Sequence, residues 1–160
     1  MAHYFITGAS SGIGKALSIA LASEGHVVSA VARRIDYLKK IKGKHKNINI
    51  FRADVCDKLE INNAIEKSIK SGGNIDCAIL NAGRYLPLGG LELNSEEFYG
   101  HMMVNYMGVI HSLDSIIPKF IGLQRGHIVI MGSTAGYGGL PRSAAYGPTK
   151  AALSNLAEAL

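Results

Sequence analysis

The sequence predicts an α/β fold, a doubly wound parallel sheet of about five strands with helices on both faces. Short apolar runs alternate with longer amphipathic helical patterns, which is typical of βαβ units. The runs are apolar throughout, as expected for strands covered on both faces, and a glycine-rich turn follows the first run. With 160 residues, of which 48% are hydrophobic, we expect one domain over residues 1–160 with a substantial core.

The first βαβ unit is the most regular part of the pattern. His3–Thr7 is expected to be a buried strand, and Ile13–Glu24 carries its apolar residues on one helical face. Gly25 is a natural helix stop because glycine adopts the left-handed conformation at little cost. Val27–Ala32 then predicts the second strand, and Asp36–Ile41 a short helix.

The next segments continue the alternation. Ile48–Phe51 predicts a third strand, Asp57–Lys70 a helix and Ile75–Leu80 a fourth strand. Asn94, followed by Glu97, resembles a capping box that starts a long helix ending near Pro118.

The last part of the chain predicts one more strand and one more helix. The strand is expected at Ile128–Met131. Pro148 fits a helix only within its first turn, so the last helix should start near Ala145–Tyr146. Right-handed crossovers then place a ligand crevice at the carboxyl ends of the strands.

Composition and charge narrow the function classes. The net charge of +5 is concentrated in Lys39–Lys46. A solvated helix end and turn explains this run better than nucleic-acid binding, because no aromatic residues interleave it. The chain has neither a membrane-length apolar run nor a signal-peptide layout. The two cysteines, Cys56 and Cys77, do not resemble a disulfide framework or a metal cluster. We therefore expect the protein to be located in the reducing cytoplasm and to have no metal site.

The glycine turn predicts dinucleotide binding. Gly8 permits a tight turn, Gly12 allows close approach to a pyrophosphate, and Gly14 allows the following helix to pack on the strand. The turn precedes a capped helix, whose N-terminus attracts phosphate. A glycine loop that serves only helix packing is the alternative. The expected binding set also includes the residues between these glycines, Ser10, Ser11 and Ile13.

The end of the second strand predicts which dinucleotide is bound. An acidic residue there would hold the ribose 2′-hydroxyl of NAD, but the segment reads Val31-Ala32-Arg33-Arg34. Arg33 can bind a 2′-phosphate with two hydrogen bonds, and Arg34 can add charge or stack on adenine. These residues favour NADP over NAD. Two surface arginines at a helix start are the alternative, although cations are unfavourable there without an anion.

Tyr146 and Lys150 predict acid/base chemistry. They are four residues apart on a predicted helix and therefore share a face. A nearby ammonium stabilises a phenolate and favours proton exchange near neutral pH. A helical surface pair is the alternative interpretation, and Ser133 and the glycine turn weigh against it.

These residues, in this order, resemble the short-chain dehydrogenase/reductase family over the whole chain. The resembling positions are Thr7–Gly14, Asp54-Val55, Asn81-Ala82-Gly83, Asn105, Ser133, Tyr146 and Lys150. The resemblance implies a Rossmann-like fold, an NADP cofactor (NADPH) and hydride transfer to or from a carbonyl or alcohol substrate.

The resemblance also implies individual roles. Tyr146 exchanges a proton with the substrate oxygen, and Ser133 holds that oxygen. Lys150 binds the nicotinamide ribose, and Asn105 positions a water that connects Lys150 to solvent. Asp54, Val55, Asn81, Ala82 and Gly83 contact the cofactor. For three of these residues a purely structural role is the alternative. Asp54 could only start a helix, Asn81 could only stabilise a turn, and Asn105 could only bond to the backbone inside its helix.

The resemblance ends before the family's last strands and substrate loop. We therefore expect a partial domain. The sequence is compatible with two functions, an NADP-dependent oxidoreductase and a catalytically incomplete nucleotide-binding module. Strand His127–Met131 is expected to be an exposed apolar edge. The family commonly pairs subunits through helices that correspond to Glu96–Phe120 and Tyr146–Leu160, which implies a homodimer. The sequence does not define the substrate.

Overall fold

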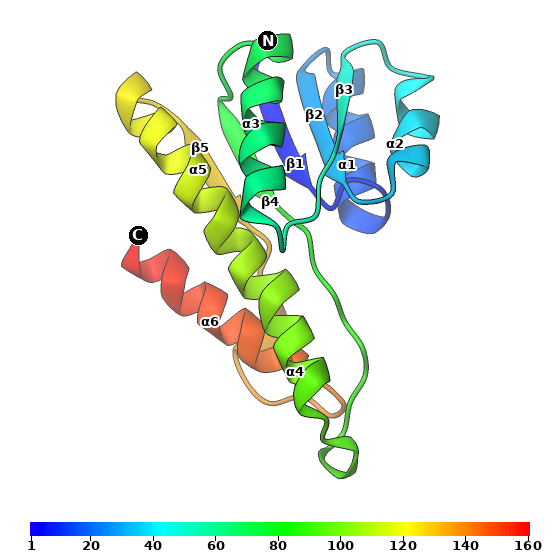
Figure 1. Cartoon of the computed structure of the whole chain (residues 1–160), viewed down its shortest axis with the longest axis vertical. Helices are drawn as coiled ribbons and strands as arrows, with labels where there is room; N and C mark the ends of the chain where they lie inside the picture. The colour runs from blue at the N-terminus through cyan, green and yellow to red at the C-terminus, as the bar shows by residue number, and fades with distance from the viewer.

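The computed structural model covers residues 1–160 and contains one parallel sheet with the strand order β3-β2-β1-β4-β5 (Figure 1). The strands are β1 (His3–Thr7), β2 (Val27–Ala32), β3 (Ile48–Arg52), β4 (Cys77–Leu80) and β5 (His127–Ile130). All four pairings are parallel. The order reverses at β1, whose neighbours are β2 and β4, so the predicted doubly wound, Rossmann-like fold is confirmed.

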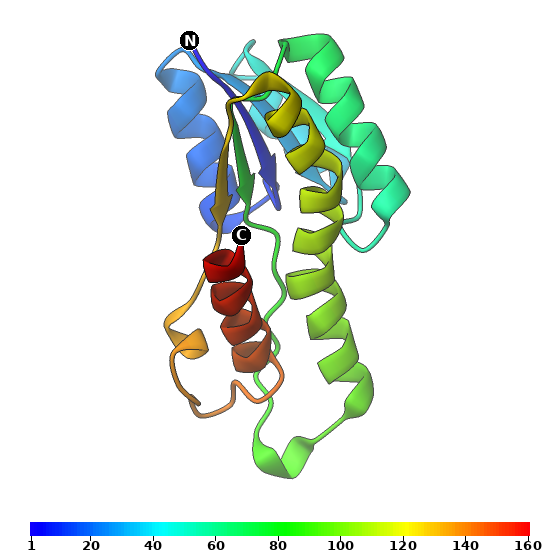
Figure 2. The same cartoon turned by 90° about the vertical axis from the view of Figure 1, so that its left-hand side faces the viewer.

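Helices cover both faces of this sheet, as Figure 2 shows for α1 on one side and α3 and α5 on the other. The helices are α1 (Gly12–Ser23), α2 (Ile35–Lys42), α3 (Lys58–Gly72), α4 (Ser95–Met102), α5 (Gly108–Leu123) and α6 (Tyr146–Ala159). Two 3-10 turns, η1 (Gly90–Glu92) and η3 (Thr134–Gly136), and a π-helical segment, η2 (Met103–Met107), complete the chain. None of the helices has the length and apolar character needed to cross a membrane.

The core consists of two apolar clusters, one on each face of the sheet. Phe5 and Ala78 belong to the cluster under α3 and α5, whereas their neighbours Ile6 and Ile79 belong to the cluster under α1 and α2. Successive strand residues point to opposite faces, so both faces bury apolar side chains. This arrangement explains why the strands are apolar throughout.

The predicted long helix differs most from the observed structure. Asn94 does cap α4, accepting a hydrogen bond from the Glu96 N–H at 3.0 Å, but Glu97 pairs with Arg84 instead of closing a capping box. The helical path then passes through η2 and continues beyond Pro118 to Leu123. The predicted end at Pro118 is therefore wrong.

The remaining boundaries shift by a few residues. The fourth strand begins at Cys77 rather than Ile75, and β5 ends at Ile130. The last helix starts at Tyr146 as predicted, with Pro148 in its first turn. As expected, β5 is an edge strand, and Ile128 and Ile130 line a groove of about 740 Å³ beside α5 and α6.

Candidate active site

The glycine turn joins β1 to α1 at the carboxyl edge of the sheet. Gly12 has a φ of +55°, and a Cβ added there would meet no atom within 4 Å, so its backbone faces open space. A Cβ on Gly14 would lie 2.5 Å from Asn81 Nδ2 and 2.6 Å from the Gly8 oxygen. The turn therefore needs Gly12 for its conformation and Gly14 for close packing.

The start of α1 differs from the predicted capped helix. Ser11 occupies the N-cap position, but its side chain makes no capping hydrogen bond. Its hydroxyl instead accepts a hydrogen bond from Arg34 at 2.8 Å. No side chain caps the first N–H groups of α1, and such free groups bind anions well.

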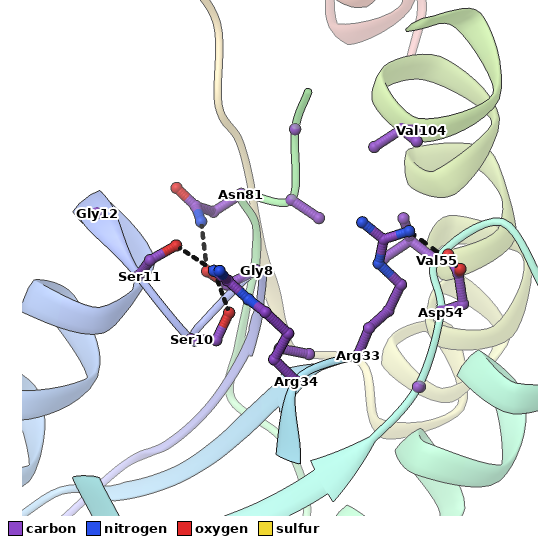
Figure 3. Close-up of a pocket in the computed structure, with 14 residues that line it drawn as sticks. Gly8, Ser10, Ser11, Gly12, Arg33, Arg34, Asp54, Val55, Asn81 and Val104 are labelled. Carbon is purple, nitrogen blue, oxygen red and sulfur yellow. Dashed lines mark hydrogen bonds and ion pairs between the residues drawn. The ribbon is translucent and has the colours of Figure 1, made fainter. Parts of the chain in front are cut away.

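A cavity of about 400 Å³ lies against this turn, between the ends of β1, β2 and β4 (Figure 3). It brings together most of the predicted cofactor-binding residues. Those that line it are Gly8, Ser10, Ser11, Gly12, Arg33, Arg34, Asp54, Val55, Asn81, Ala82 and Gly83. Ile13 and Gly14 are not among the lining residues, and Ile13 is largely exposed.

Arg33 and Arg34 both reach the cavity from the end of β2, and they make different contacts (Figure 3). Arg33 lies 3.5 Å from the Asp54 carboxylate, and two thirds of its side chain is exposed. Arg34 donates hydrogen bonds to the hydroxyls of Ser10 and Ser11 and lies 4.7 Å from the centre of the Tyr37 ring. An exposed ion pair is weak, so Arg33 can exchange Asp54 for an anionic ligand.

Asn81 ties the end of β4 to the end of β1. Its backbone N–H donates to Thr7 Oγ1 at 3.0 Å, and its side-chain amide donates to the Thr7 carbonyl at 3.1 Å. The Ala82 N–H donates to the same Thr7 hydroxyl. Thr7 belongs to the resembling segment Thr7–Gly14, but the sequence does not predict that its hydroxyl holds the end of β4. Val104, which also lines the cavity, had no sequence signal because it belongs to the distant segment η2.

Lys150 and Tyr146 lie on α6, next to the end of β5. The Lys150 ammonium donates to the Met131 carbonyl at 2.6 Å and lies 5.7 Å from the centre of the Tyr146 ring. The Lys150 side chain is buried, and burial lowers its pKa below the ordinary lysine value. Ser133 precedes η3, where its hydroxyl accepts a hydrogen bond from the Ala135 N–H at 3.2 Å.

Asn105 is fully buried in η2 and connects three segments. Its amide oxygen accepts from the Arg84 N–H at 2.6 Å, and its amide nitrogen donates to the Arg84 carbonyl and to Thr149 Oγ1, both at 3.0 Å. The Thr149 hydroxyl in turn donates to the Tyr146 carbonyl at 2.7 Å. The amide nitrogen of Asn105 therefore bonds to protein atoms of two other segments, and neither partner is backbone of its own helical segment.

The cavity does not include the predicted catalytic group. Asn105, Ser133, Tyr146 and Lys150 are not among the residues that line it. The fold thus brings the glycine turn and the two arginines together at one site. It positions the four predicted catalytic residues on segments that follow β4 and β5.

A glycine turn at the switch point of a doubly wound parallel sheet defines the class of dinucleotide-binding α/β domains. A family model described as short chain dehydrogenase matches residues 2–160. The chain belongs to the short-chain dehydrogenase/reductase family of oxidoreductases.

Relatives and solved structures agree with this assignment. An oxidoreductase of Listeria monocytogenes is 36% identical over 160 residues, covering 97% of this chain and 64% of the relative. A 3-ketodihydrosphingosine reductase of Dictyostelium discoideum is 33% identical, covering 99% of this chain and 54% of the relative. The structure of a closed serine dehydrogenase complexed with NADP+ is 26% identical with a TM-score of 0.93, covering 98% of this chain and 64% of that one. The chain thus spans about two thirds or less of the length of these proteins.

Proposed function

We propose that the protein is an NADP-dependent oxidoreductase that transfers hydride between the cofactor and a carbonyl or alcohol substrate. The observation that carries the proposal is the pair Arg33 and Arg34 on the cavity beside the glycine turn, at the end of a strand that supplies no carboxylate. A reductase and a dehydrogenase among the similar proteins support the carbonyl and alcohol class.

The residues present fit such a cofactor. Gly12 opens the turn to a pyrophosphate, and the free N–H groups of α1 would hold its charge. Arg33 and Arg34 would bind a 2′-phosphate, while Asp54 and Val55 would contact the adenine end. When bound, a nicotinamide cofactor supplies the hydride chemistry.

The residues of α6 and its neighbours would handle the substrate oxygen. Tyr146 would give a proton to this oxygen in reduction and take it back in oxidation. Ser133 would hold the oxygen by a hydrogen bond from its hydroxyl. The Lys150 ammonium would stabilise the phenolate of Tyr146. Asn105 would hold the first turn of α6 in place, because it donates a hydrogen bond to Thr149, whose hydroxyl donates to the Tyr146 carbonyl.

A binding experiment tests the cofactor preference. We expect the chain to bind NADPH at least about tenfold more tightly than NADH in fluorescence titrations, because a charge-assisted hydrogen bond contributes about 1.5–3 kcal/mol. Arg33→Ala and Arg34→Ala should each weaken NADPH binding about tenfold and change NADH binding much less. Arg125→Ala is the matched control, since Arg125 is also exposed and paired with an aspartate, Asp76.

Equal affinity of the wild-type chain for NADPH and NADH would contradict the NADP preference. Loss of NADPH and NADH binding to the same extent in Arg34→Ala would show that the arginine supports the turn rather than the 2′-phosphate.

A nucleotide-binding module with little turnover is the second candidate function. It is favoured by the position of Tyr146 and Lys150 outside the lining of the cavity beside the glycine turn, because this cavity does not join them to the predicted cofactor-binding residues. We therefore expect residues 1–160 to oxidise NADPH slowly or not at all with a generic carbonyl compound. A normal steady-state rate that Tyr146→Phe abolishes, without weakening NADPH binding, would favour the oxidoreductase and reject the binding module.

We also propose that two copies of the chain pair through α4, α5 and α6. Apolar side chains lie exposed on these helices, including Tyr99, Met102 and Ile121.

A further inference from the structure

The ring of Tyr85 packs against the ring of Tyr146. The two ring centres are 5.0 Å apart with an angle of 65° between the planes, which is the favourable edge-to-face geometry of aromatic pairs. Lys150 also approaches Tyr146, at 5.7 Å from the ring centre. The Tyr146 ring therefore has an aromatic neighbour and a cationic neighbour.

The loop that carries Tyr85 is fastened on both sides of this residue. Asn105 binds both the N–H and the carbonyl of Arg84, immediately before Tyr85. The Leu86 N–H, immediately after it, donates to the Nε2 atom of His101 at 3.0 Å. Asn105 and His101 are fully buried, so the backbone around Tyr85 is anchored to the interior of the protein.

The same loop is joined to the segment that leads into α6. The Leu88 N–H donates to the Arg142 carbonyl at 2.9 Å, and the Leu88 carbonyl accepts from the Ala144 N–H at 3.3 Å. These bonds form a parallel bridge between Leu88 and Ser143, three residues before Tyr146. Two backbone hydrogen bonds thus tie the loop to the segment that immediately precedes α6.

Tyr85 itself remains half exposed in this rigid setting. A buried aromatic residue would serve packing, whereas an exposed ring held by buried anchors presents one face to solvent. That exposure leaves its ring accessible to a substrate that approaches the Tyr146 hydroxyl.

We propose that Tyr85 is a positioning residue that orients the Tyr146 ring for proton transfer. This inference rests on the proposed role of Tyr146. The anchors at Arg84, Leu86 and Leu88 fix the loop, and the edge-to-face contact transmits that position to the phenol. The aromatic ring of Tyr85 carries this function, and its hydroxyl does not.

The experiment compares Tyr85→Leu, which removes the ring, with Tyr85→Phe, which keeps it. The matched control is Tyr137→Leu, because Tyr137 is an exposed tyrosine that makes no aromatic pair with Tyr146. Single-turnover oxidation of NADPH with an aldehyde should slow roughly three- to tenfold in Tyr85→Leu, in line with the strength of an aromatic pair. NADPH affinity should stay unchanged in all three variants, and Tyr85→Phe and Tyr137→Leu should react like the wild type.

A second readout does not need turnover. In spectra of protein with 13C-labelled tyrosine, the Tyr146 signals are identified by their loss in Tyr146→Phe. Cross-relaxation should connect the Tyr85 and Tyr146 rings in the wild type. Tyr85→Leu should shift and broaden the Tyr146 ring signals, and Tyr85→Phe should restore them.

The two readouts separate the possible failures. If the wild type does not react but Tyr146 loses its fixed ring position in Tyr85→Leu, the proposed function fails, while the orientation of the Tyr146 ring by Tyr85 stands. If Tyr146 keeps its ring signals and its rate in Tyr85→Leu, the positioning role is overturned. An equal loss of rate in Tyr137→Leu would also overturn it.

Discussion

His3 is an ionisable side chain held inside the molecule. Its Nδ1 lies 2.9 Å from the Gly73 carbonyl and its Nε2 lies 2.8 Å from the Ser29 hydroxyl. Because a carbonyl can only accept, Nδ1 carries the hydrogen, and in the neutral ring Nε2 accepts from Ser29. Burial lowers the pKa of His3 below 6.5, and the Gly73 carbonyl and Asp76 only partly oppose this effect.

This burial predicts a loss of stability in acid. Below pH 6.5 the unfolded chain takes up a proton at His3 before the folded chain does, so the free energy of unfolding falls until the folded pKa is passed. In urea unfolding, the wild type should therefore lose stability relative to His3→Gln between pH 7.5 and pH 5. His127→Gln is the control, because His127 is exposed. A His3→Gln difference that does not change with pH would contradict the prediction.

At the residue scale, the site could be predicted where one local motif determines it. The conformations of Gly8, Gly12 and Gly14 follow from the demands of a single turn, and the closeness of Lys150 to Tyr146 follows from their spacing on one helix. Tyr85 could not be predicted, because its contact with Tyr146 depends on loop anchors that are distant in sequence.

At the element scale, local signals located helix starts better than helix ends. The helix predicted from Asp57 begins at Lys58, and the Asp57 carboxylate caps it by accepting hydrogen bonds from the Leu59 and Glu60 N–H groups. The end of α5 was missed, because the helix continues through Pro118 while Ile116 and Phe120 pack in the core. The helix stops at Gln124, which takes the left-handed conformation that glycine usually supplies.

The π-helical segment η2 was also absent from the sequence prediction. A π-turn inserts into a helix without a residue signature of its own and often occurs at functional sites. Here Asn105 lies within η2, where it is buried and bonded to Arg84 and Thr149. The sequence therefore predicts Asn105 as a site residue, whereas its contacts require the three-dimensional structure.

At the scale of the whole molecule, the parallel sheet followed from the repeated βαβ pattern, because right-handed crossovers leave few topologies. The sequence predicted the arrangement of the segments beyond the carboxyl ends of β4 and β5 less well. There α4, α6 and the loops after β4 and β5 gather at one end of the molecule, as Figures 1 and 2 show. The Leu88–Ser143 bridge joins these loops across more than fifty residues, and no local pattern encodes it.

The proposed pairing of two chains is a property of the whole molecule. Tyr99 and Met102 are three residues apart on α4, so they share a helical face, and both are exposed. A two-fold axis would bring this face against its own copy, and a stable interface of this kind buries about 1,200–2,000 Å². Sedimentation equilibrium should therefore give twice the chain mass of 17.0 kDa.

Replacing Tyr99 with lysine tests whether α4 forms the dimer interface. In a two-fold dimer, the introduced ammonium groups of the two chains would both be buried close to each other, which is unfavourable. Tyr99→Lys should return the mass to that of one chain, with the unfolding midpoint changed little because Tyr99 is exposed. Tyr37→Lys is the matched control, since Tyr37 is also a half-exposed tyrosine but lies on α2, against the other face of the sheet. A wild-type chain that sediments as a single copy at all concentrations would refute the pairing, and equal dissociation by Tyr37→Lys would refute its location on α4.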